Sequence, residues 1–282
     1  MITRSDDERF QDGAQDYAAY LETPEGRLRT DLAFANLREF LPTPQAKKQM
    51  YALDVGCGTG ATAVRLARLG FRVTQLDSSQ AMLDIARRTT EEARVTNRVT
   101  LQHGEAAQLT DLFSAASFDV VLCHNILEYV EDPGAVLHGA ARALRDTSAI
   151  LSIVVRNQSG EVLKAAIQTG DLAAAEANLT AEWGFESLYG GRVRLFTSQR
   201  LQTMLQAELL ALIAERGIRV LADYLPPLIS RSSEYARILE LERKLGSRPE
   251  FARVARYTHC LARPIPSRRK TALDGGPGEN IA

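Results

Sequence analysis

Three glycines at alternate positions follow an apolar run near residue 50, and two aspartates accompany them. The stretch LDVGCGTG contains Gly56, Gly58 and Gly60, with Asp54 two residues ahead and Asp77 closing the next apolar run. Glycines in a strand-to-helix turn let the backbone come close to a ligand. A carboxylate at the end of the second strand can accept both hydroxyl protons of a ribose. The pattern therefore predicts a nucleoside-binding loop.

Two ligands compete for this loop. Gly56, Gly58 and Ala61 satisfy the dinucleotide spacing G-x-G-x-x-A, whereas Gly60 completes a G-x-G-x-G spacing. Asp54 would repel a pyrophosphate, but its charge favours the amino group and the sulfonium of S-adenosylmethionine. Asp77 does not discriminate, because nicotinamide enzymes bind ribose in the same way. The residues thus favour S-adenosylmethionine and leave a nicotinamide-dependent oxidoreductase as an alternative.

The loop resembles the cofactor loop of class I S-adenosylmethionine-dependent methyltransferases. The stretch FDVVLCHNILEYVEDP resembles the fourth motif of members that act on small molecules, quinones and tRNA bases, and the likeness spans roughly residues 50–155. The resemblance implies that Glu105, Ala106 and Ala107 read the adenine. It also implies that His124 lines the cofactor pocket together with Gly56, Cys57 and Asp77.

The flanking segments are similar to a narrower group, the bacterial enzymes that methylate the carboxyl of 5-carboxymethoxyuridine in tRNA. The N-terminal element is Gly-Arg-Leu-Arg at 26–29, and the C-terminal part has the order Gly-x-x-Val, Asp-Tyr, Leu-Glu-Leu-Glu and Arg-Tyr-x-His. By this likeness Arg29 binds the carboxylate of the cofactor. The predicted cofactor-binding residues are Arg29, Asp54, Gly56, Cys57, Gly58, Asp77, Glu105, Ala106, Ala107 and His124.

The charge of the chain does not support tRNA as a partner. The 282 residues contain 34 basic and 35 acidic side chains, which gives a net charge of −1. The segment at about 157–187 has one lysine and several acids where the tRNA group has a lysine-rich run, so counterion release would contribute little there. An anionic or hydroxyl-bearing acceptor is expected, with tRNA and a small acid or phenol as competing candidates.

An anionic acceptor determines which residues should bind it. Methyl transfer is an in-line displacement that depends on positioning, and a carboxylate nucleophile needs no general base at pH 7. We expect Arg192 or Arg194 to orient the acceptor and Tyr129 or Tyr189 to lie near the mouth of the site. The sequence identifies no catalytic side chain and no metal site.

The elements that must position these residues alternate between strands and helices. Apolar runs at 51–56, 72–77, 99–104, 118–125 and 149–155 alternate with helical patterns, which predicts an α/β fold with a mostly parallel, doubly wound, Rossmann-like sheet. A helix is expected to run through residue 217, and C-terminal strands at 218–227 and 257–264 should close the sheet. The predicted parts are an N-terminal helical lid (1–48), a cofactor-binding core (49–156), a substrate-side helical insertion (157–216), closing strands and helix (217–263) and a disordered tail (264–282).

The remaining composition indicates an ordinary cytoplasmic protein. Cys57, Cys123 and Cys260 are far apart and are expected to be buried free thiols, and no apolar run reaches the length of a membrane span. His259 and Trp183 are expected in the core. The sequence therefore predicts a methyltransferase acting on an oxygen, with 5-carboxymethoxyuridine in tRNA or a small molecule as acceptor. An NADP-dependent oxidoreductase and a non-catalytic cofactor-binding protein are the alternatives, and the oligomeric state is left open.

Overall fold

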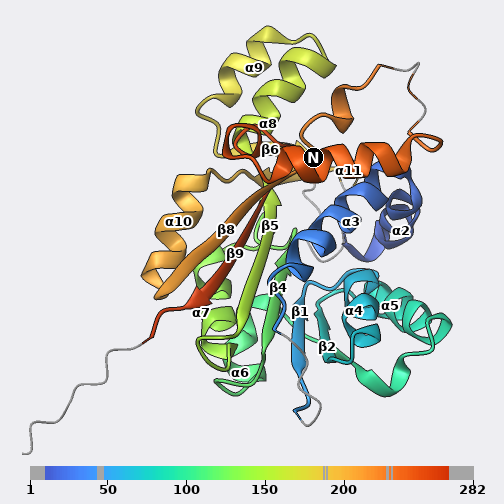
Figure 1. Ribbon diagram of the computed structural model, residues 1–282, viewed down its shortest axis with the longest axis vertical. Helices are drawn as coiled ribbons and strands as arrows, with labels where there is room; N and C mark the ends of the chain where they lie inside the picture. Colours follow the sequence, from blue (N-terminus) through green and yellow to red (C-terminus); the bar gives the residue numbers. More distant parts are fainter. Residues whose placement is uncertain are drawn as a thin grey trace, which may run out of the picture.

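A seven-stranded sheet forms the centre of the computed structural model, which describes residues 10–42, 48–186, 188, 190–226, 229 and 231–266. The strand order is β3-β2-β1-β4-β5-β9-β8 (Figure 1). β9 is antiparallel to β5 and β8, and the other four adjacent pairs are parallel. The strands of this sheet are β1 (Tyr51–Val55), β2 (Arg72–Asp77), β3 (Val99–His103), β4 (Val120–His124), β5 (Ile150–Arg156), β8 (Leu210–Ile218) and β9 (Tyr257–Pro264). The predicted α/β fold with a mostly parallel sheet is confirmed.

Helices cover both faces of the sheet. Successive strand residues point to opposite faces, so Val55 of β1 packs in a core with α7 and α10, while Ala52 packs in a second core with α3 and α4. The helices are α2 (Ala14–Glu22), α3 (Pro24–Arg38), α4 (Ala61–Arg68), α5 (Gln80–Glu92), α6 (Leu109–Leu112), α7 (Pro133–Ala143), α8 (Gln158–Leu163), α9 (Leu172–Asn178), α10 (Ser198–Ala207), α11 (Tyr235–Gly246) and α12 (Pro249–Ala252). β1 to β5 run parallel to one another, so all five end at the same edge of the sheet.

The segment after β5 contains a short second sheet as well as helices. α8 leads into a π-helical turn, η3 (Lys164–Gln168), and then into α9. β6 (Trp183–Glu186) and β7 (Gly191–Arg194) pair antiparallel as a two-stranded sheet. Figure 1 shows α8, α9 and β6 together beyond the end of β5. The insertion predicted as helical at 157–216 therefore also carries strands.

Two predictions for the C-terminal half were wrong. The helix expected through residue 217 ends at Ala207, and Leu209 has a left-handed φ of 54° before β8 begins at Leu210. Apolar residues in this stretch fit either a helical or an alternating period, and pairing along β9 decides for the strand. The strand expected at 218–227 covers only the last residue of β8, followed by the 3₁₀ turn η4 (Ala222–Tyr224).

Other expectations concern the tail, the core and the membrane. Most of the tail predicted as disordered, from residue 267 onward, lies outside the described residues. His259 is fully buried as predicted, but Trp183 is 37% exposed because it lies on the small second sheet rather than under the main one. Across the ranges described above, no helix combines the length and the apolar character needed to cross a bilayer.

Candidate active site

The loop after β1 is held in a form that glycine favours. Gly56 has a φ of 66° and Gly58 a φ of 51°, both in the left-handed region. A Cβ on Gly56 would lie 2.8 Å from the Ile126 side chain. The N–H of Gly58 donates to Oδ2 of Asp77 at 2.8 Å, so the glycine loop and the carboxylate that closes β2 form one unit.

Asp77 is positioned by the turn that follows it. The N–H of Ser79 donates to its Oδ1 at 3.0 Å, and Ser79 then caps α5. Burial raises the pKa of the Asp77 carboxyl, although these N–H groups favour its charged form. The carboxyl lines a cavity at the carboxyl ends of the strands, where α/β sheets bind their ligands.

This cavity, called here the loop cavity, has a volume of about 310 Å³. Its wall is formed by the glycine loop, the ends of β2, β3 and β4, and residues from the N-terminal helices. The predicted residues that line it are Arg29, Gly56, Gly58, Asp77, Glu105, Ala106, Ala107, His124 and Tyr129.

A smaller inner cavity of about 50 Å³ adjoins the loop cavity through Arg29, Gly56 and His124. Asp54 and Cys57 line it, so all ten residues predicted to bind the cofactor lie on these two cavities. Burial raises the pKa of the Cys57 thiol well above its usual value, which makes it a poor nucleophile.

The inner cavity contains opposite charges that the described part of the chain leaves unpaired. Arg29 is 8% exposed and has no carboxylate partner among the described residues; its guanidinium donates to the Tyr17 hydroxyl at 2.8 Å. Asp54 is 4% exposed, and no described group makes a hydrogen bond or ion pair with its carboxyl. Burial, aided by the charge of Asp77, raises the pKa of Asp54 to about 7. The cavity therefore suits a ligand that carries both an anion and a cation.

His124 is held by a hydrogen-bonded relay that crosses the sheet. Its Nε2 lies 2.7 Å from Oγ of Ser152, which lies 2.8 Å from Nε2 of His259; Nδ1 of His259 lies 3.4 Å from Nδ2 of Asn36. Burial lowers the pKa of both imidazoles, that of His124 to about 3, so both rings are neutral. Because the Asn36 amide donates, we assign the proton of His124 to Nδ1. His124 thus offers an N–H donor where it lines the two cavities.

A third cavity of about 540 Å³, called here the arginine cavity, shares Tyr17, Arg29 and Tyr129 with the loop cavity. Its other charged residues come from the start of α3, from β5, η3 and β6, and from the turns beside β8 and β9. Five cationic and three acidic residues line it: Arg29, Arg156, Lys164, Arg219, Arg256, Glu25, Glu186 and Asp223. The excess of positive charge suits an anionic ligand.

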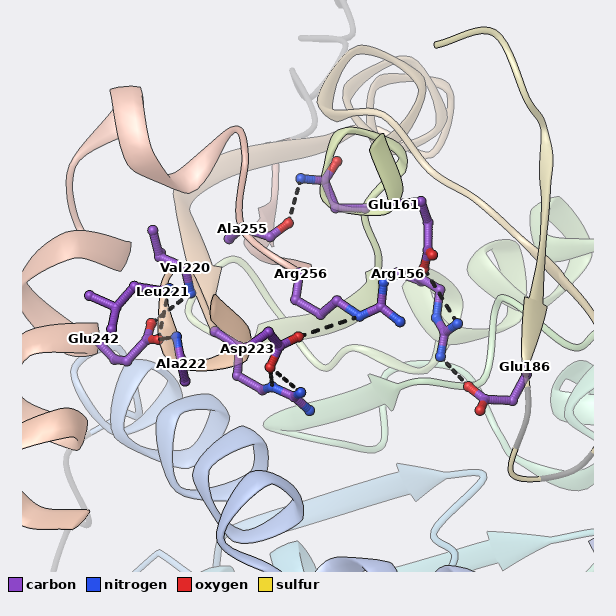
Figure 2. A network of polar contacts seen from close by, with 12 residues as sticks. Arg156, Glu161, Glu186, Val220, Leu221, Ala222, Asp223, Glu242, Ala255 and Arg256 are labelled. Atoms are coloured by element: carbon purple, nitrogen blue, oxygen red, sulfur yellow. Dashed lines mark hydrogen bonds and ion pairs between the residues drawn. The ribbon is translucent and has the colours of Figure 1, made fainter. Parts of the chain in front are cut away.

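Ion pairs hold three of these arginines in place. Arg156 pairs with Glu186 (Figure 2), Arg256 donates to Glu161 at 2.6 Å, and Arg219 pairs with Asp223. Burial raises the pKa of the Tyr257 phenol, but four arginines around it, with Arg29 the largest influence, lower it to about 8. The guanidinium groups thus converge around Tyr257 on the cavity wall.

A buried carboxylate fixes the turn that carries Arg219. Glu242 of α11 is fully buried and accepts three backbone N–H bonds, from Val220 at 2.7 Å, Leu221 at 3.0 Å and Ala222 at 2.8 Å (Figure 2). Arg219 itself has a left-handed φ of 60°. Burial raises the pKa of Glu242, while the three N–H groups stabilise its charged form. The turn is therefore built before any ligand arrives.

The structure places the predicted acceptor-binding arginines elsewhere. Arg192 and Arg194 lie on β7, where their guanidinium groups stack on Trp183 at 4.6 and 4.4 Å from the ring centroid, and neither lines a cavity described above. Tyr129 lines both the loop cavity and the arginine cavity, whereas Tyr189 lies outside the described residues. The reason is topological, because β7 belongs to the small two-stranded sheet and not to the main sheet, whose strand ends form the cavities.

Sequence reasoning missed the arginines that do line the third cavity. A signal for Arg156 was present, since it directly follows the apolar run at 149–155 and so ends a strand at the same edge as Asp77. Arg256 and Tyr257 stand where an antiparallel strand begins, and Tyr257 pairs with Arg156 in the register. An antiparallel strand starts where its neighbour ends, so the pairing of β9 with β5 brings Arg256 and Tyr257 beside Arg156.

The chain is similar to known methyltransferases. A family profile described as a methyltransferase domain matches residues 53–151. The chain is 26% identical over 265 residues to the tRNA 5-carboxymethoxyuridine methyltransferase of Escherichia coli (strain K12), covering 94% of this chain and 99% of that protein. It is 39% identical over 95 residues to a ubiquinone biosynthesis O-methyltransferase of Xanthomonas oryzae pv. oryzae, covering 33% of this chain and 38% of that protein. The magnesium protoporphyrin IX methyltransferase of Synechocystis PCC 6803, solved with bound SAH, has a TM-score of 0.59 at 15% identity, covering 92% and 98% of the two chains.

Proposed function

Because this chain belongs to the class I S-adenosylmethionine-dependent methyltransferases, we propose that it methylates a carboxylate oxygen, that of 5-carboxymethoxyuridine in tRNA. The observation that carries the proposal is the arginine cavity, which has five cationic residues against three acidic ones and shares a wall with the loop cavity. The E. coli relative, named for this tRNA substrate, matches nearly the full length of the chain.

The inner and loop cavities fit the cofactor by charge. An unpaired guanidinium and an unpaired carboxyl are costly when buried, and a ligand of opposite charges removes that cost. Arg29 would bind the cofactor carboxylate and Asp54 its ammonium, while Asp77 accepts from the ribose hydroxyls. When bound, S-adenosylmethionine supplies a methyl group activated by the sulfonium.

The residues of the arginine cavity would orient the acceptor. Tyr17, Arg29 and Tyr129 line both this cavity and the loop cavity, so the acceptor carboxylate and the methyl group meet at that shared wall. An ionised acceptor oxygen would accept the methyl group that the bound cofactor supplies, so no residue of the cavity would have to remove a proton. The arginines and Lys164 hold the carboxylate in line, which is the main contribution that a methyltransferase makes.

The test is to offer the purified protein with labelled S-adenosylmethionine to three acceptors: tRNA carrying 5-carboxymethoxyuridine, the same tRNA unmodified, and a panel of small acids and phenols. Label should enter only the carboxymethoxyuridine tRNA. A methyl ester is released by mild alkali, whereas a methylated phenol or base is stable, so alkali treatment identifies the oxygen.

Label that enters the unmodified tRNA, or label that survives alkali, would contradict the carboxylate assignment. Lys244→Gln, at an exposed side chain of α11 that lines none of the three cavities, provides a variant that should match the parent protein in every arm.

A small-molecule acid is the second candidate acceptor. An arginine cavity of about 540 Å³ is within the size range of pockets for small molecules, and the Xanthomonas relative is named as an O-methyltransferase. Label appearing only in the small-molecule arm would decide for this candidate.

A further inference from the structure

The two-stranded sheet β6–β7 presents four chemically distinctive side chains on one face. Trp183 pairs with Arg194 and Phe185 with Arg192, and directly paired residues lie on the same side of a sheet. The opposite side packs inward, since Val193 is fully buried and a Cβ on Gly184 would lie 3.1 Å from Leu195. We call the side with Trp183, Phe185, Arg192 and Arg194 the outer face.

The outer face carries an exposed phenylalanine, a partly exposed tryptophan and two guanidinium groups that no described carboxylate neutralises. Phe185 is 64% exposed and Trp183 is 37% exposed. Both guanidinium groups stack on Trp183, and within the described ranges neither forms an ion pair with a carboxylate. Arg194 donates instead to the carbonyl oxygen of Glu131 at 3.2 Å. Exposed rings beside guanidinium groups without a carboxylate partner are typical of surfaces that bind the bases and phosphates of a single-stranded nucleic acid.

The outer face also lies next to the catalytic cavities along the chain. Glu186 follows Phe185 directly on β6, and its carboxylate reaches Arg156 on the wall of the arginine cavity (Figure 2). Glu131, whose carbonyl holds Arg194, lines the loop cavity. A polymer with one residue in the arginine cavity would therefore have its neighbouring residues near this face.

We propose that the outer face binds the single-stranded nucleotides that flank the methylated residue in an RNA loop. Phe185 stacks with a flanking base, while Trp183 holds the guanidinium groups of Arg192 and Arg194, which contact the phosphates. This inference rests on the proposed function, and it gives a cationic contact to a chain whose overall charge provides none.

A protein partner fits these observations less well than RNA. A stable protein interface buries about 800 Å² on each side, with an apolar core that is depleted in charge. The outer face offers two rings flanked by two guanidinium groups, which suits alternating bases and phosphates.

The experiment uses the full chain and an RNA stem–loop that carries 5-carboxymethoxyuridine in its loop. Phe185→Ala and Arg192→Gln are compared with Leu172→Ala, a 73% exposed apolar side chain on α9, and Arg237→Gln, an 86% exposed side chain on α11. Binding is measured by fluorescence anisotropy at several salt concentrations. Turnover is measured separately on the stem–loop and on free 5-carboxymethoxyuridine nucleoside.

Phe185→Ala should weaken stem–loop binding by about tenfold, which is the usual effect of one lost base stack. Arg192→Gln should lower the salt dependence of binding by about 0.7 in log–log slope, the value for one phosphate of a single strand. Both control variants should bind the stem–loop as the parent does. KM for the free nucleoside should stay unchanged in Phe185→Ala, since the nucleoside has no flanking bases.

Equal stem–loop binding by Phe185→Ala and the parent would overturn the inference and leave the proposed function standing. An equal loss on nucleoside and stem–loop would also overturn it, because it would indicate a structural role. If neither substrate is methylated but stem–loop binding still depends on Phe185, the proposed function fails, and the inference is overturned in its claim that the bound nucleotides flank a methylated residue. The stem–loop could also fail to bind the parent protein, while another protein binds the parent but neither outer-face variant. That result would overturn the inference and make the outer face a surface for a protein partner.

Discussion

Asp54 is a residue of the inner cavity whose charge changes near neutral pH. Its pKa is raised to about 7 by burial and by the charge of Asp77. In the proposed binding mode, the cofactor ammonium pairs with the ionised carboxylate of Asp54, so binding below pH 7 must release a proton. Affinity for S-adenosylhomocysteine should therefore rise with pH by about tenfold per unit below 7 and level off above about 8.

Calorimetric titrations between pH 5.5 and 8.5 measure this dependence directly. Asp54→Asn should bind more weakly at pH 8 and should lose most of the slope. Any slope that persists in Asp54→Asn belongs to Asp77, whose pKa is also raised. An affinity of the parent protein that does not change with pH would remove Asp54 from ammonium binding.

A substitution at Lys164 tests whether the arginine cavity binds the acceptor, and it breaks no ion pair among the described residues. It lines the cavity, partial burial lowers its pKa, and within the described residues it forms no salt bridge. Lys164→Gln should raise KM for an anionic acceptor by about tenfold, the usual cost of one charge-assisted hydrogen bond. Affinity for S-adenosylhomocysteine should stay unchanged, since Lys164 lines neither the loop cavity nor the inner cavity.

Steady-state kinetics with Lys164→Gln and the exposed control Lys244→Gln separate this effect from a change in global charge. An unchanged KM in Lys164→Gln would show that the acceptor carboxylate is bound elsewhere.

At the scale of elements, the relay links three strands and a helix to one side chain of the site. His124 is on β4, Ser152 on β5, His259 on β9 and Asn36 on α3. Ser152→Ala should break the relay and free the His124 ring to change tautomer. We expect S-adenosylhomocysteine to bind about fivefold to tenfold more weakly, since a buried hydrogen bond typically contributes about 1 kcal/mol.

Imidazole N–H signals in the proton NMR spectrum report on the relay independently of activity. The parent should show exchange-protected imidazole protons that Ser152→Ala loses and that the exposed control Ser114→Ala retains. Loss of the signals with unchanged ligand affinity would restrict the relay to a structural role.

The sequence predicts those parts of the site that depend on neighbouring residues in the chain, and it does not predict those that depend on the pairing of distant strands. The loop cavity was predictable because Gly56, Asp77 and His124 each follow a buried strand, and parallel strands bring their carboxyl ends together. The arginine cavity was not predicted, because Arg156 and Arg256 meet only through the antiparallel pairing of β5 with β9. The sequence predicts a helix at β8 because its apolar spacing fits a helical as well as an alternating period. Only the pairing with β9 distinguishes the two.

At the scale of the whole molecule, the N-terminal helices and the sheet meet at the shared wall of the cavities. Tyr17 of α2 and Arg29 of α3 line all three cavities. We propose that this part acts as the lid expected at 1–48. S-Adenosylhomocysteine should then slow amide hydrogen exchange in α2 at least tenfold more than in α7, which lines none of the cavities.

Hydrogen exchange followed by mass spectrometry, with and without ligand, measures both helices in one experiment. Equal protection of α2 and α7 would mean that the ligand stiffens the fold as a whole, and α2 would not be a lid.

The surplus of positive charge around Tyr257 has a consequence for the end of the reaction. In the proposed reaction, esterification converts the anion that these guanidinium groups would attract into a neutral methyl ester. The reaction thus removes the negative charge by which the acceptor would be recognised. The esterified molecule should compete poorly with fresh acceptor, so turnover would proceed without strong inhibition by accumulated ester.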